Sequence, residues 1–570
     1  MPSDIEKIAR KIALKNAHDY GKASVSAVLG KLLSAAPESK SDVKKTAELV
    51  EKVVNEVNAL SSIEIENEFK NYEEEFRIAE KEKEKRTAKP RMELEGAVEG
   101  NFATRFPPEP NGYMHIGHAK AAFLESEFAK IYKGKLFLYF DDTNPEAERQ
   151  EFADAIKRDL DWLGIKFDKE YYASDNIEMQ YKYAEKLIAE GNAYVCSCTK
   201  EEMQKDRMAK TECVHRKQSA KENLRLWQEM LSGKMDENSA VLRLAGDMKS
   251  VNTVMRDPVL FRIKKHGHYR QKNKYIVWPT YNFNTPVIDS VYGVTDVIRS
   301  KEYELRDELY VTLLNMLGLR QPRIHSIARL EIEGNITSKR KLNKLIKQGL
   351  LKGYDDPRLI TIAALRRRGI APEAIRDFVL RFGMSKANST VSIDMLLAEN
   401  RKILDSKAKR LFMVKDPVPL EVEGIGSMHV KLRMHPDYDL GYREYDVGSS
   451  FFISGKDAKE LSTGEKIRMK DLYNVEILSL GDSIMTRFIG NESIDAKKLQ
   501  WISAGNYISC TLEHIGRLMI GEEFNMKSLE ESKGYVESAA ASLDEGDVVQ
   551  FEREGFFKLD DKAGEKFISL

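Results

Sequence analysis

The sequence feature that most constrains the fold is the proline- and glycine-rich segment 105–118, which reads RFPPEPNGYMHIGH. Residues 101–106 have the pattern of a short strand, and residues 119–131 have the pattern of an amphipathic helix. We therefore expect a strand-to-helix turn, whose free N–H groups and helix dipole suit a phosphate group. His115 and His118 are three residues apart, so both imidazole rings face one side of the helix and can reach one anion.

An isolated pair of histidines at this spacing has a second interpretation, as half of a metal site or as a surface pair without function. The complete segment is more specific, because it resembles the HIGH signature of class I aminoacyl-tRNA synthetases in its glutamyl and glutaminyl form. The resemblance implies that His115 and His118 bind the α-phosphate of ATP and that Gly117 lets the adenine approach the backbone. It places three further residues in the ATP site: Glu109, Pro110 and Asn111.

Length and charge limit the class of protein only loosely. The 570 residues suffice for roughly three or four domains. The 91 basic and 91 acidic residues cancel, so a tRNA-binding protein would need its basic residues segregated onto one face. No apolar run could span a membrane and no signal peptide is evident, which predicts a cytoplasmic protein without a membrane partner. With four cysteines, a disulfide framework is not expected.

Residues 1–95 are expected to form a helical N-terminal extension with a charged linker. Apolar residues recur at helical spacing in residues 5–12, 25–32 and 43–57. Between residues 64 and 89 glutamate and lysine dominate, which is typical of a solvated helix or a flexible linker.

Residues 96–185 and 273–330 alternate strand and helix patterns, which predicts an α/β domain whose parallel sheet is covered on both faces. The first half has a strand at residues 135–140, followed by a helical pattern at 146–163. We expect the sheet to resume at 277–283 and to continue through 293–302. In such sheets ligands bind beyond the carboxyl ends of the strands. By resemblance, these two halves are the Rossmann-type catalytic domain of a class I synthetase.

The strand at residues 135–140 ends at Asp141, within the sequence Asp-Asp-Thr-Asn-Pro. From the residues alone this sequence fits a turn that starts a helix as well as a ligand site at the sheet edge. The family resemblance implies that Asp141 binds the α-ammonium group of the amino-acid substrate. Relatives usually carry an arginine two residues earlier, where this chain has Tyr139, so no contact of that arginine can be transferred.

Residues 186–272 interrupt the alternating pattern and resemble the inserted acceptor-stem-binding domain of the family. This insertion contains four candidate zinc ligands: Cys196, Cys198, Cys213 and His215. On strands, residues two apart share a face, so the two pairs could complete a tetrahedral site with three cysteines and one histidine. Three reduced, partly buried thiols beside a surface histidine are the alternative. The resemblance favours zinc, because some glutamyl enzymes bind zinc in this insertion.

Arg299 follows an apolar strand pattern and is the residue that bears most on the substrate. The glutaminyl enzymes have cysteine at the matching position, because their substrate has a neutral side chain. Glutamyl enzymes have arginine, whose forked donors pair with a carboxylate. The resemblance therefore implies glutamate as the substrate, with Arg105 as a second contact to its carboxylate and Tyr281 lining the pocket.

Residues 329–341 read as a basic patch on a loop, and they also match the second class I signature, the KMSKS loop, without a gap. Ile336 and Thr337 replace its first two residues, whereas Ser338 and Lys339 remain. The resemblance implies that Lys339 contacts the departing phosphates of ATP. The same comparison completes the ATP site with four residues: Ser300, Arg329, Leu330 and Ser338.

Two further regions follow the catalytic core. Residues 331–408 comprise this loop and a helical connecting domain, in which residues 355–359 are expected to open a helix. Residues 409–570 alternate apolar and polar positions between frequent turns, which predicts antiparallel β-barrels. They resemble the anticodon-binding barrels of archaeal and eukaryotic glutamyl enzymes and of glutaminyl enzymes, which are expected to read splayed, stacked bases.

Together these features predict an archaeal-type glutamyl-tRNA synthetase. The resemblance implies that ATP, with Mg²⁺, activates L-glutamate to glutamyl-adenylate, and that the glutamyl group is then transferred to the 3′ end of tRNA(Glu). Charging of tRNA(Gln) as well stays open, and we expect a monomer. A glutaminyl-tRNA synthetase is the alternative enzyme, opposed mainly by Arg299. A synthetase-like RNA-binding or scaffold protein is the non-enzymatic alternative.

Overall fold

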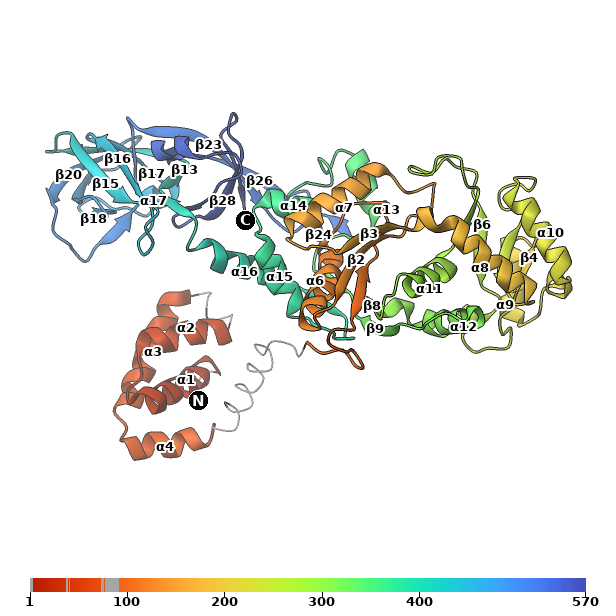
Figure 1. The fold of residues 1–570 in the computed structure, drawn as a ribbon. Helices are drawn as coiled ribbons and strands as arrows, with labels where there is room; N and C mark the ends of the chain where they lie inside the picture. Colours follow the sequence, from red (N-terminus) through yellow and green to blue (C-terminus); the bar gives the residue numbers. More distant parts are fainter. Residues whose placement is uncertain (1–3, 37–38, 40–41, 73–75, 77–91) are drawn as a thin grey trace. The chain divides into compact units, whose positions relative to one another are not determined.

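The computed structural model describes residues 4–36, 39, 42–72, 76 and 92–570 (Figure 1). The chain divides into two compact units, Met1–Lys89 and Pro90–Leu570, and each is described by itself below. Much of the charged linker predicted for residues 64–89 lies outside the described residues.

The first unit contains four described helices that include the three apolar stripes of the sequence. They are α1 (Asp4–Tyr20), α2 (Val25–Ala35), α3 (Val43–Asn58) and α4 (Ser62–Lys70). Helix α3 starts where the Asp42 carboxylate accepts a hydrogen bond from the Lys45 N–H, at 3.0 Å. The buried core of this unit, which includes Ala13, Leu32 and Val50, consists of residues from these helices and the turns between them.

The second unit begins with three parallel strands joined by two helices. These elements are β1 (Ala103–Phe106), α6 (Ile116–Ile131), β2 (Lys135–Phe140), α7 (Gln150–Trp162) and β3 (Lys169–Tyr172). Strand β2 lies between β1 and β3 and is buried after its first residue. Phe123 and Phe128 of α6 pack against this sheet in one hydrophobic core. The predicted strand at 135–140 is confirmed, whereas the helix expected from residue 146 begins at Gln150.

A second parallel pair lies beside β1. It consists of β8 (Asp296–Ser300) and β9 (Arg323–Ile327), accompanied by helices α11 (Tyr281–Val291) and α12 (Asp307–Leu317). The Thr295 N–H donates to the Ala103 carbonyl at 2.8 Å, which places the start of β8 next to β1. The carboxyl ends of β1, β2 and β8 are therefore the edge where ligands are expected.

An antiparallel four-stranded sheet separates these two groups in the sequence. Its strands are β4 (Ala193–Cys196), β5 (Val241–Leu244), β6 (Val259–Ile263) and β7 (Val277–Pro279), and its helices are α8 (Ile177–Ala189), α9 (Lys200–Ala209) and α10 (Ala220–Leu231). The expectation that residues 277–283 resume the parallel sheet is wrong. Strand β7 pairs antiparallel with β6, and Thr280 already caps helix α11. A short apolar run does not reveal by its period whether it is strand or helix, or which sheet it joins.

The connecting region contains two short parallel strands and four helices. They are β10 (Leu330–Ile332), α13 (Lys339–Lys347), α14 (Ile362–Arg368), α15 (Pro372–Leu380), β11 (Ser389–Val391) and α16 (Asp394–Leu404). The helix expected to open at residues 355–359 is wrong, because these residues form turns and α14 begins after Thr361. The Asp356 carboxylate accepts the backbone N–H groups of Lys352 and Arg358, which stabilises the turns instead of a helix.

The C-terminal part forms two seven-stranded, barrel-like sheets with separate cores. In sequence order their strands are β12 (Lys409–Leu411), β13 (Met413–Lys415), β14 (Val418–Glu423), β17 (Ser450–Ile453), β18 (Lys466–Met469), β19 (Asn474–Ser479), β20 (Ile484–Gly490), β21 (Lys497–Leu499), β22 (Ile502–Ser503), β23 (Tyr507–Ile515), β26 (Leu529–Glu537), β27 (Val548–Phe551), β28 (Gly555–Asp561) and β29 (Lys566–Ser569). The predicted antiparallel pairing holds for most neighbours, but β14–β20, β18–β21, β12–β27 and β23–β29 are parallel. Alternation along one strand indicates burial and does not specify the direction of its partner.

A hairpin after β23 supports the second signature loop. Its strands are β24 (Met519–Ile520) and β25 (Glu523–Phe524). The Met519 N–H donates to the Gly334 carbonyl at 3.0 Å. The buried Leu518 side chain packs in one cluster with Ile336 and Leu342, so apolar contacts with the segment before the hairpin stabilise the loop.

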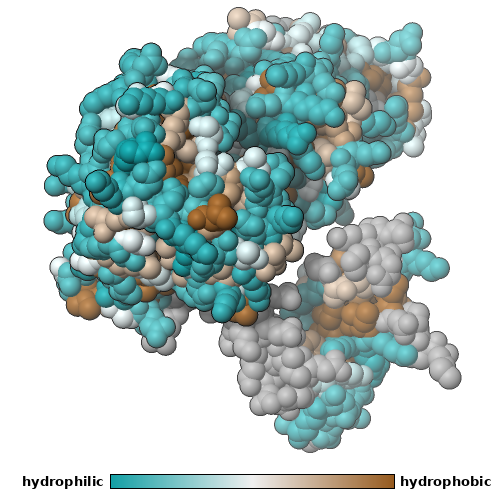
Figure 2. Space-filling view, turned by 90° about the vertical axis from the view of Figure 1, so that its right-hand side faces the viewer, coloured by the Kyte–Doolittle hydropathy of each residue, from teal (hydrophilic) through white to brown (hydrophobic). Residues whose placement is uncertain are grey.

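No helix in the described ranges is both long and apolar enough to cross a membrane. The face of the second unit in Figure 2 is mostly hydrophilic, and its hydrophobic residues form small separate groups.

Candidate active site

His115 and His118 meet at the N-terminus of α6, as the sequence predicts. His115 is the N-cap residue, and its Nδ1 accepts the Gly117 N–H at 3.1 Å. The Nδ1 of His118 accepts the His115 N–H at 3.1 Å, and the two rings stack with centroids 3.9 Å apart. Because both Nδ1 atoms are acceptors, each neutral ring carries its proton on Nε2. The pair can therefore supply two neutral N–H donors.

Burial keeps both rings neutral. It lowers the pKa of His118 to about 4. Burial, followed by repulsion from His118 and Arg329, lowers the pKa of His115 well below its usual value. At neutral pH the site therefore offers hydrogen bonds to an anion without carrying imidazolium charge.

Gly117 occupies a position where any side chain would displace the His115 ring. A Cβ there would lie 2.9 Å from Cε1 of His115 and 3.9 Å from the Leu330 carbonyl oxygen. The adjacent Lys120 Nζ donates to the Ala328 carbonyl at 2.9 Å. Arg329 and Leu330, which were assigned to the ATP site from sequence, thus lie against the start of α6.

The loop before α6 is fixed to the end of β2. The Pro108 carbonyl accepts the Asp141 N–H at 3.1 Å, and the Pro110 carbonyl accepts the Arg149 N–H at 3.0 Å. Glu109 lies close enough to Asp141 to raise the pKa of that carboxyl. The proline-rich loop and the acidic turn therefore border the same edge of the sheet.

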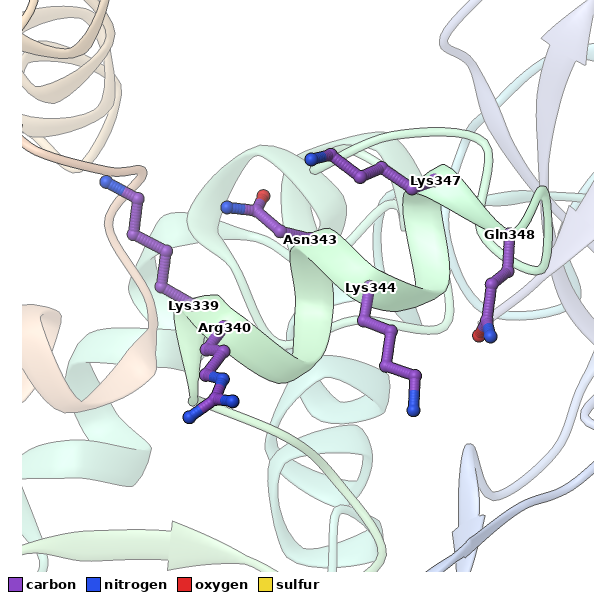
Figure 3. A pocket seen from close by; sticks show the side chains of 6 residues that line it. All are labelled: Lys339, Arg340, Asn343, Lys344, Lys347 and Gln348. Atoms are coloured by element: carbon purple, nitrogen blue, oxygen red, sulfur yellow. The ribbon is translucent and has the colours of Figure 1, made fainter.

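Lys339 is the first residue of α13 and reaches this loop. A Cβ at Gly112 would lie 3.6 Å from the Lys339 Cδ, and the Nζ lies 4.9 Å from the Phe152 ring centroid. Burial lowers the pKa of Lys339, and the nearby Glu109 opposes this shift. Figure 3 shows Lys339 at the start of α13, pointing away from Lys344 and Lys347. The structure thus brings the two signature segments together.

Ser300 and Arg329 lie where β8 and β9 end. Ser300 pairs in register with Ile327, two residues before Arg329. The Ser300 hydroxyl accepts the Glu302 N–H at 3.4 Å, and Arg329 forms an ion pair with Glu302. Both residues therefore belong to the rim of the site.

A small pocket surrounds Arg299. Its lining residues are Tyr281, Asn282, Pro286, Arg299, Arg306, Leu309 and Tyr310. The Arg299 Nη1 donates to the Tyr281 hydroxyl at 3.2 Å, and Nη2 pairs with Asp307. The buried Arg299 Nε has no hydrogen-bond partner among the described residues. A buried guanidinium with a spare donor suits a carboxylate ligand.

Arg105 lies deeper than the sequence suggests. Its side chain is 2 % exposed, and its Nε and Nη2 donate to the two oxygens of Asp289 at 2.7 and 3.2 Å. Glu125 lies 3.9 Å from Nη1 and is equally buried. The charge of Arg105 is therefore already compensated within the protein, whereas Arg299 keeps a spare donor.

Asp141 is half-buried at the carboxyl end of β2. Burial, and then repulsion from Glu109, raises the pKa of its carboxyl to about 7. The neighbouring Asp142 is fully buried and accepts the Ser174 N–H and hydroxyl at 2.8 and 2.7 Å. Asp141 is therefore the member of the acidic pair that remains available to a ligand, and Asp142 has a structural role.

The four candidate zinc ligands come together, although not by the strand geometry expected. Only Cys196 lies on a strand, and Cys213 caps a short 3₁₀ turn, η3 (Val214–Lys217), which carries His215. The Sγ of Cys213 lies 3.7 Å from that of Cys196, 3.3 Å from that of Cys198 and 3.1 Å from the His215 Nδ1. Tetrahedral zinc with Zn–S bonds of about 2.3 Å separates its ligand atoms by about 3.7 Å, so these side chains fit the metal.

The surroundings of this cluster also suit a metal. The Ser197 hydroxyl lies 2.9 Å from the His215 Nε2, so the other ring nitrogen faces the thiols. The buried Arg243 donates to the Cys196 Sγ at 3.6 Å. A second group, Glu146, Glu237 and His266, is less suitable because Lys264 already forms ion pairs of 2.9 Å with both carboxylates.

Sequence reasoning missed two buried amides next to Asp141. Asn284 of α11 donates to the Asp141 Oδ1 at 2.8 Å, and Gln180 of α8 donates to Asn284 at 3.0 Å. The only available signal was the position of Asn284 three residues after Tyr281, on the same face of a helix.

Comparisons with known proteins cover the whole chain. Residues 101–406 match the family model of the catalytic domain of class I tRNA synthetases (E and Q). Residues 408–488 and 498–560 match the models of the anti-codon binding domain of the same family.

Two curated relatives are similar over their full lengths, and both are named "Glutamate--tRNA ligase". The protein of Nitrosopumilus maritimus is 42% identical over 567 residues, which are 98% of this chain and 98% of the relative. That of Pyrococcus furiosus is 41% identical over 579 residues, with coverage of 100% and 99%. A solved glutamate-tRNA synthetase from Elizabethkingia anophelis is 21% identical and covers 53% of this chain and 70% of its own, with a TM-score of 0.41.

Proposed function

Because the chain belongs to the class I tRNA synthetases for glutamate and glutamine, we propose that it is the ligase that joins L-glutamate to tRNA(Glu) at the expense of ATP. Its catalytic domain is followed by anticodon-binding domains that form barrel-like sheets. The relatives that align over the full chain at about 40% identity are glutamate ligases.

The observation that carries the proposal for the site is the convergence of the two signature segments. Lys339 lies over Gly112, and the Leu330 carbonyl lies next to Gly117. The stacked His115 and His118 lie at the start of α6, beside Gly117. Such a cradle of N–H donors with one lysine suits a nucleoside triphosphate.

In the first step glutamate attacks the α-phosphate of ATP and pyrophosphate leaves. Negative charge grows on the α-phosphate and on the leaving group, so catalysis consists mainly of positioning and electrostatic stabilisation. The neutral His115 and His118 donate to the α-phosphate, and Lys339 neutralises the departing phosphates. Mg²⁺ accompanies the nucleotide. The remaining proposed ATP contacts are Glu109, Pro110, Asn111, Gly117, Ser300, Arg329, Leu330 and Ser338.

The amino-acid pocket is proposed between Arg299 and Asp141. Arg299, with Tyr281 beside it, pairs with the side-chain carboxylate of glutamate, and Asp141 pairs with the α-ammonium group. Arg105 acts on this carboxylate only at a longer range, because Asp289 occupies its guanidinium. The spare Nε donor of Arg299 suits a ligand oxygen, and a guanidinium binds the charged carboxylate of glutamate more strongly than the neutral amide of glutamine.

The second step transfers the glutamyl group to a ribose hydroxyl at the 3′ end of tRNA. We propose that residues 186–272 bind the acceptor stem, that 331–408 connect the domains and that the barrels of 409–570 bind the anticodon. The parallel strands of 96–185 and 273–330 then form one Rossmann-type sheet, preceded by a helical extension of residues 1–95. Zinc held by Cys196, Cys198, Cys213 and His215 would cross-link the start of the insertion. A monomeric state belongs to the same proposal, and charging assays with tRNA(Gln) decide whether this tRNA is a second substrate.

Parallel charging of tRNA with labelled glutamate and glutamine tests the substrate. We expect glutamate to be attached in preference to glutamine, and a preference for glutamine would identify a glutaminyl-tRNA synthetase. ATP–pyrophosphate exchange with added tRNA tests the enzyme class, and no exchange with either glutamate or glutamine would leave only a binding or scaffold role.

A further inference from the structure

We propose that Asn284 is a positioning residue that turns the Asp141 carboxylate toward the α-ammonium group of glutamate, with Gln180 fixing the orientation of the Asn284 amide. This inference rests on the proposed function, because it requires glutamate as the ligand of Asp141.

The contacts form a buried chain from α8 to the end of β2. The Asn284 Nδ2 donates to the Tyr139 hydroxyl at 2.6 Å and to the Asp141 Oδ1 at 2.8 Å. The Asn284 Oδ1 accepts the Gln180 Nε2 at 3.0 Å. Asn284 and Gln180 are both fully buried, and Tyr139 is 2 % exposed, so water does not compete for these bonds.

Hydrogen-bond chemistry allows only one orientation of the Asn284 amide. A carboxylate is an acceptor only, so the NH₂ group must face Asp141. The two protons of that NH₂ group match the two acceptors, Tyr139 and Asp141. The remaining oxygen then needs a donor, which Gln180 supplies. A flipped amide would place its oxygen against the carboxylate and its NH₂ against another NH₂.

The helix that carries Asn284 also carries Tyr281. The two residues are three apart on α11, so they lie on one face of the helix. Tyr281 contacts Arg299, and Asn284 contacts Asp141. One rigid element thus sets the distance between the two charged groups that are proposed to bind the two ends of glutamate.

The bond from Asn284 leaves one oxygen of Asp141 for a ligand. Its Oδ1 accepts Asn284 and, more weakly, the Thr143 hydroxyl at 3.4 Å. Its Oδ2 has no hydrogen bond to any residue that the structure describes. The carboxylate is therefore tethered by one oxygen and presents the other, which is the arrangement required to orient an ammonium group.

The test replaces Asn284 by leucine, which has a similar size but no donor, and measures tRNA-dependent ATP–pyrophosphate exchange. We expect Asn284→Leu to raise the KM for glutamate about tenfold or more, the effect of losing a hydrogen bond to a charged group. The KM for ATP should stay within about twofold. Gln180→Leu leaves the buried Asn284 Oδ1 without its donor and so holds the amide less firmly, which should also raise the glutamate KM, by a smaller factor.

Glutarate, which lacks the α-ammonium group, is used as an inhibitor to distinguish misplacement of the Asp141 carboxylate from a general disruption of the glutamate pocket. Its inhibition constant should be the same in the wild type and in Asn284→Leu, because Asp141 has no ammonium group to bind. Equal weakening of glutamate and glutarate, or a glutamate KM within twofold of the wild type, would overturn the inference. If Asn284→Leu does not fold, Gln180→Leu carries the same comparison.

Asn400→Leu is a matched control. Asn400 is also buried and its amide makes two backbone hydrogen bonds, to Ala371 and Gly369, far from the pocket in sequence. Its replacement should leave the glutamate KM within about twofold, and a tenfold increase would show that losing any buried amide has this effect.

Failure of the wild type to activate glutamate would instead refute the proposed function. If Asp141→Asn left the KM for glutamate unchanged, Asp141 would not bind glutamate and Asn284 would have no positioning role.

Discussion

Arg299 combines burial with an incomplete set of partners. Asp307 and the Tyr281 hydroxyl occupy its Nη atoms, whereas its Nε is buried without a partner among the described residues. A ligand carboxylate would therefore complete its hydrogen bonding.

We expect Arg299→Cys to reduce kcat/KM for glutamate by about 100-fold or more. A buried carboxylate that loses its charged partner costs about 3 kcal/mol or more, which corresponds to such a factor. The KM for ATP should change little, because the ATP contacts lie on other elements. ATP–pyrophosphate exchange at varied glutamate and ATP concentrations measures the kinetic constants for each substrate. Equal reductions of kcat/KM for glutamate and for ATP would contradict a role of Arg299 in the glutamate pocket.

The raised pKa of Asp141 predicts an acid limb in the activity profile. Burial and then Glu109 raise this pKa to about 7, so the carboxyl loses its charge as the pH falls below 7. Only the charged form attracts an ammonium group, so kcat/KM for glutamate should fall about tenfold between pH 6.5 and 5.5. His115 and His118 are already neutral there, with the pKa of His118 lowered to about 4. A profile for glutamate that stays flat over this range would contradict the role of Asp141.

For single residues, the sequence predicted those inside motifs and missed the distant residues that form hydrogen bonds or ion pairs with them. His115, His118 and Lys339 could be found because the chemistry of a phosphate site lies within two short segments. Asn284 and Asp289 could not, because their partners Asp141 and Arg105 lie 143 and 184 residues away. Such pairs depend on tertiary packing, which a local pattern does not contain.

Among the elements, helix α13 offers a direct test of how a lysine is used. Lys339 at its start reaches the loop at Gly112, whereas Lys344 on the same helix lies apart from that loop (Figure 3). Lys339→Ala should lower the rate of glutamate-dependent exchange about 100-fold, as expected when a charge that stabilises the transition state is removed. Lys344→Ala should stay within about twofold. If both variants lost activity equally, α13 would act through its overall positive charge.

The four candidate zinc ligands, Cys196, Cys198, Cys213 and His215, predict a bound metal. Protein purified without added zinc should contain about one zinc per chain, measured by elemental analysis. Cys198→Ser should lose it and lower the melting temperature, because η3 and the end of β4 lose their cross-link. Chelation should lower the melting temperature of the wild type and leave that of Cys198→Ser unchanged. A metal-free wild type of unchanged stability would contradict the zinc site.

The elements that sequence placed incorrectly share one cause. Residues 277–283 and 355–359 contain apolar or cap-like residues that fit a strand or helix locally. In the structure β7 joins β6, and Asp356 holds its turns by backbone hydrogen bonds. The cysteine–histidine cluster formed although only Cys196 is on a strand, because the 3₁₀ turn after Cys213 supplies the geometry instead. Local patterns indicated the candidate ligands but not the backbone that presents them.

At the scale of the molecule, the first unit completes its own core. Its buried residues, such as Ala13, Val50 and Val57, pack among its own helices. Removing residues 1–89 should therefore leave a folded chain whose glutamate-dependent exchange stays within about twofold of the full protein. The exchange rate and a melting curve of the shortened chain measure this. A loss of activity above tenfold would give the N-terminal unit a direct part in catalysis or in tRNA binding.

The helical character of the first residues and the β character of the last were the most predictable properties of the chain. The helical spacing at 43–57 appears as α3, and the alternation predicted within 409–570 appears in strands such as β19. The parallel pairs inside the barrel-like sheets, such as β14–β20, were not predictable, because they depend on which distant strands meet.

The buried Arg105 has a consequence for how this chain can change over generations. Its guanidinium lies between Asp289 and Glu125, and loss of the arginine alone would leave Asp289 buried without a counter-charge. Breaking such a pair typically costs about 3–5 kcal/mol, a large part of the stability of a protein. Substitutions at these positions are therefore epistatic, because loss of Arg105 is tolerated only after Asp289 has been replaced by a neutral residue. A lineage can reach a different set of residues here only through intermediates in which a carboxylate is lost before the arginine.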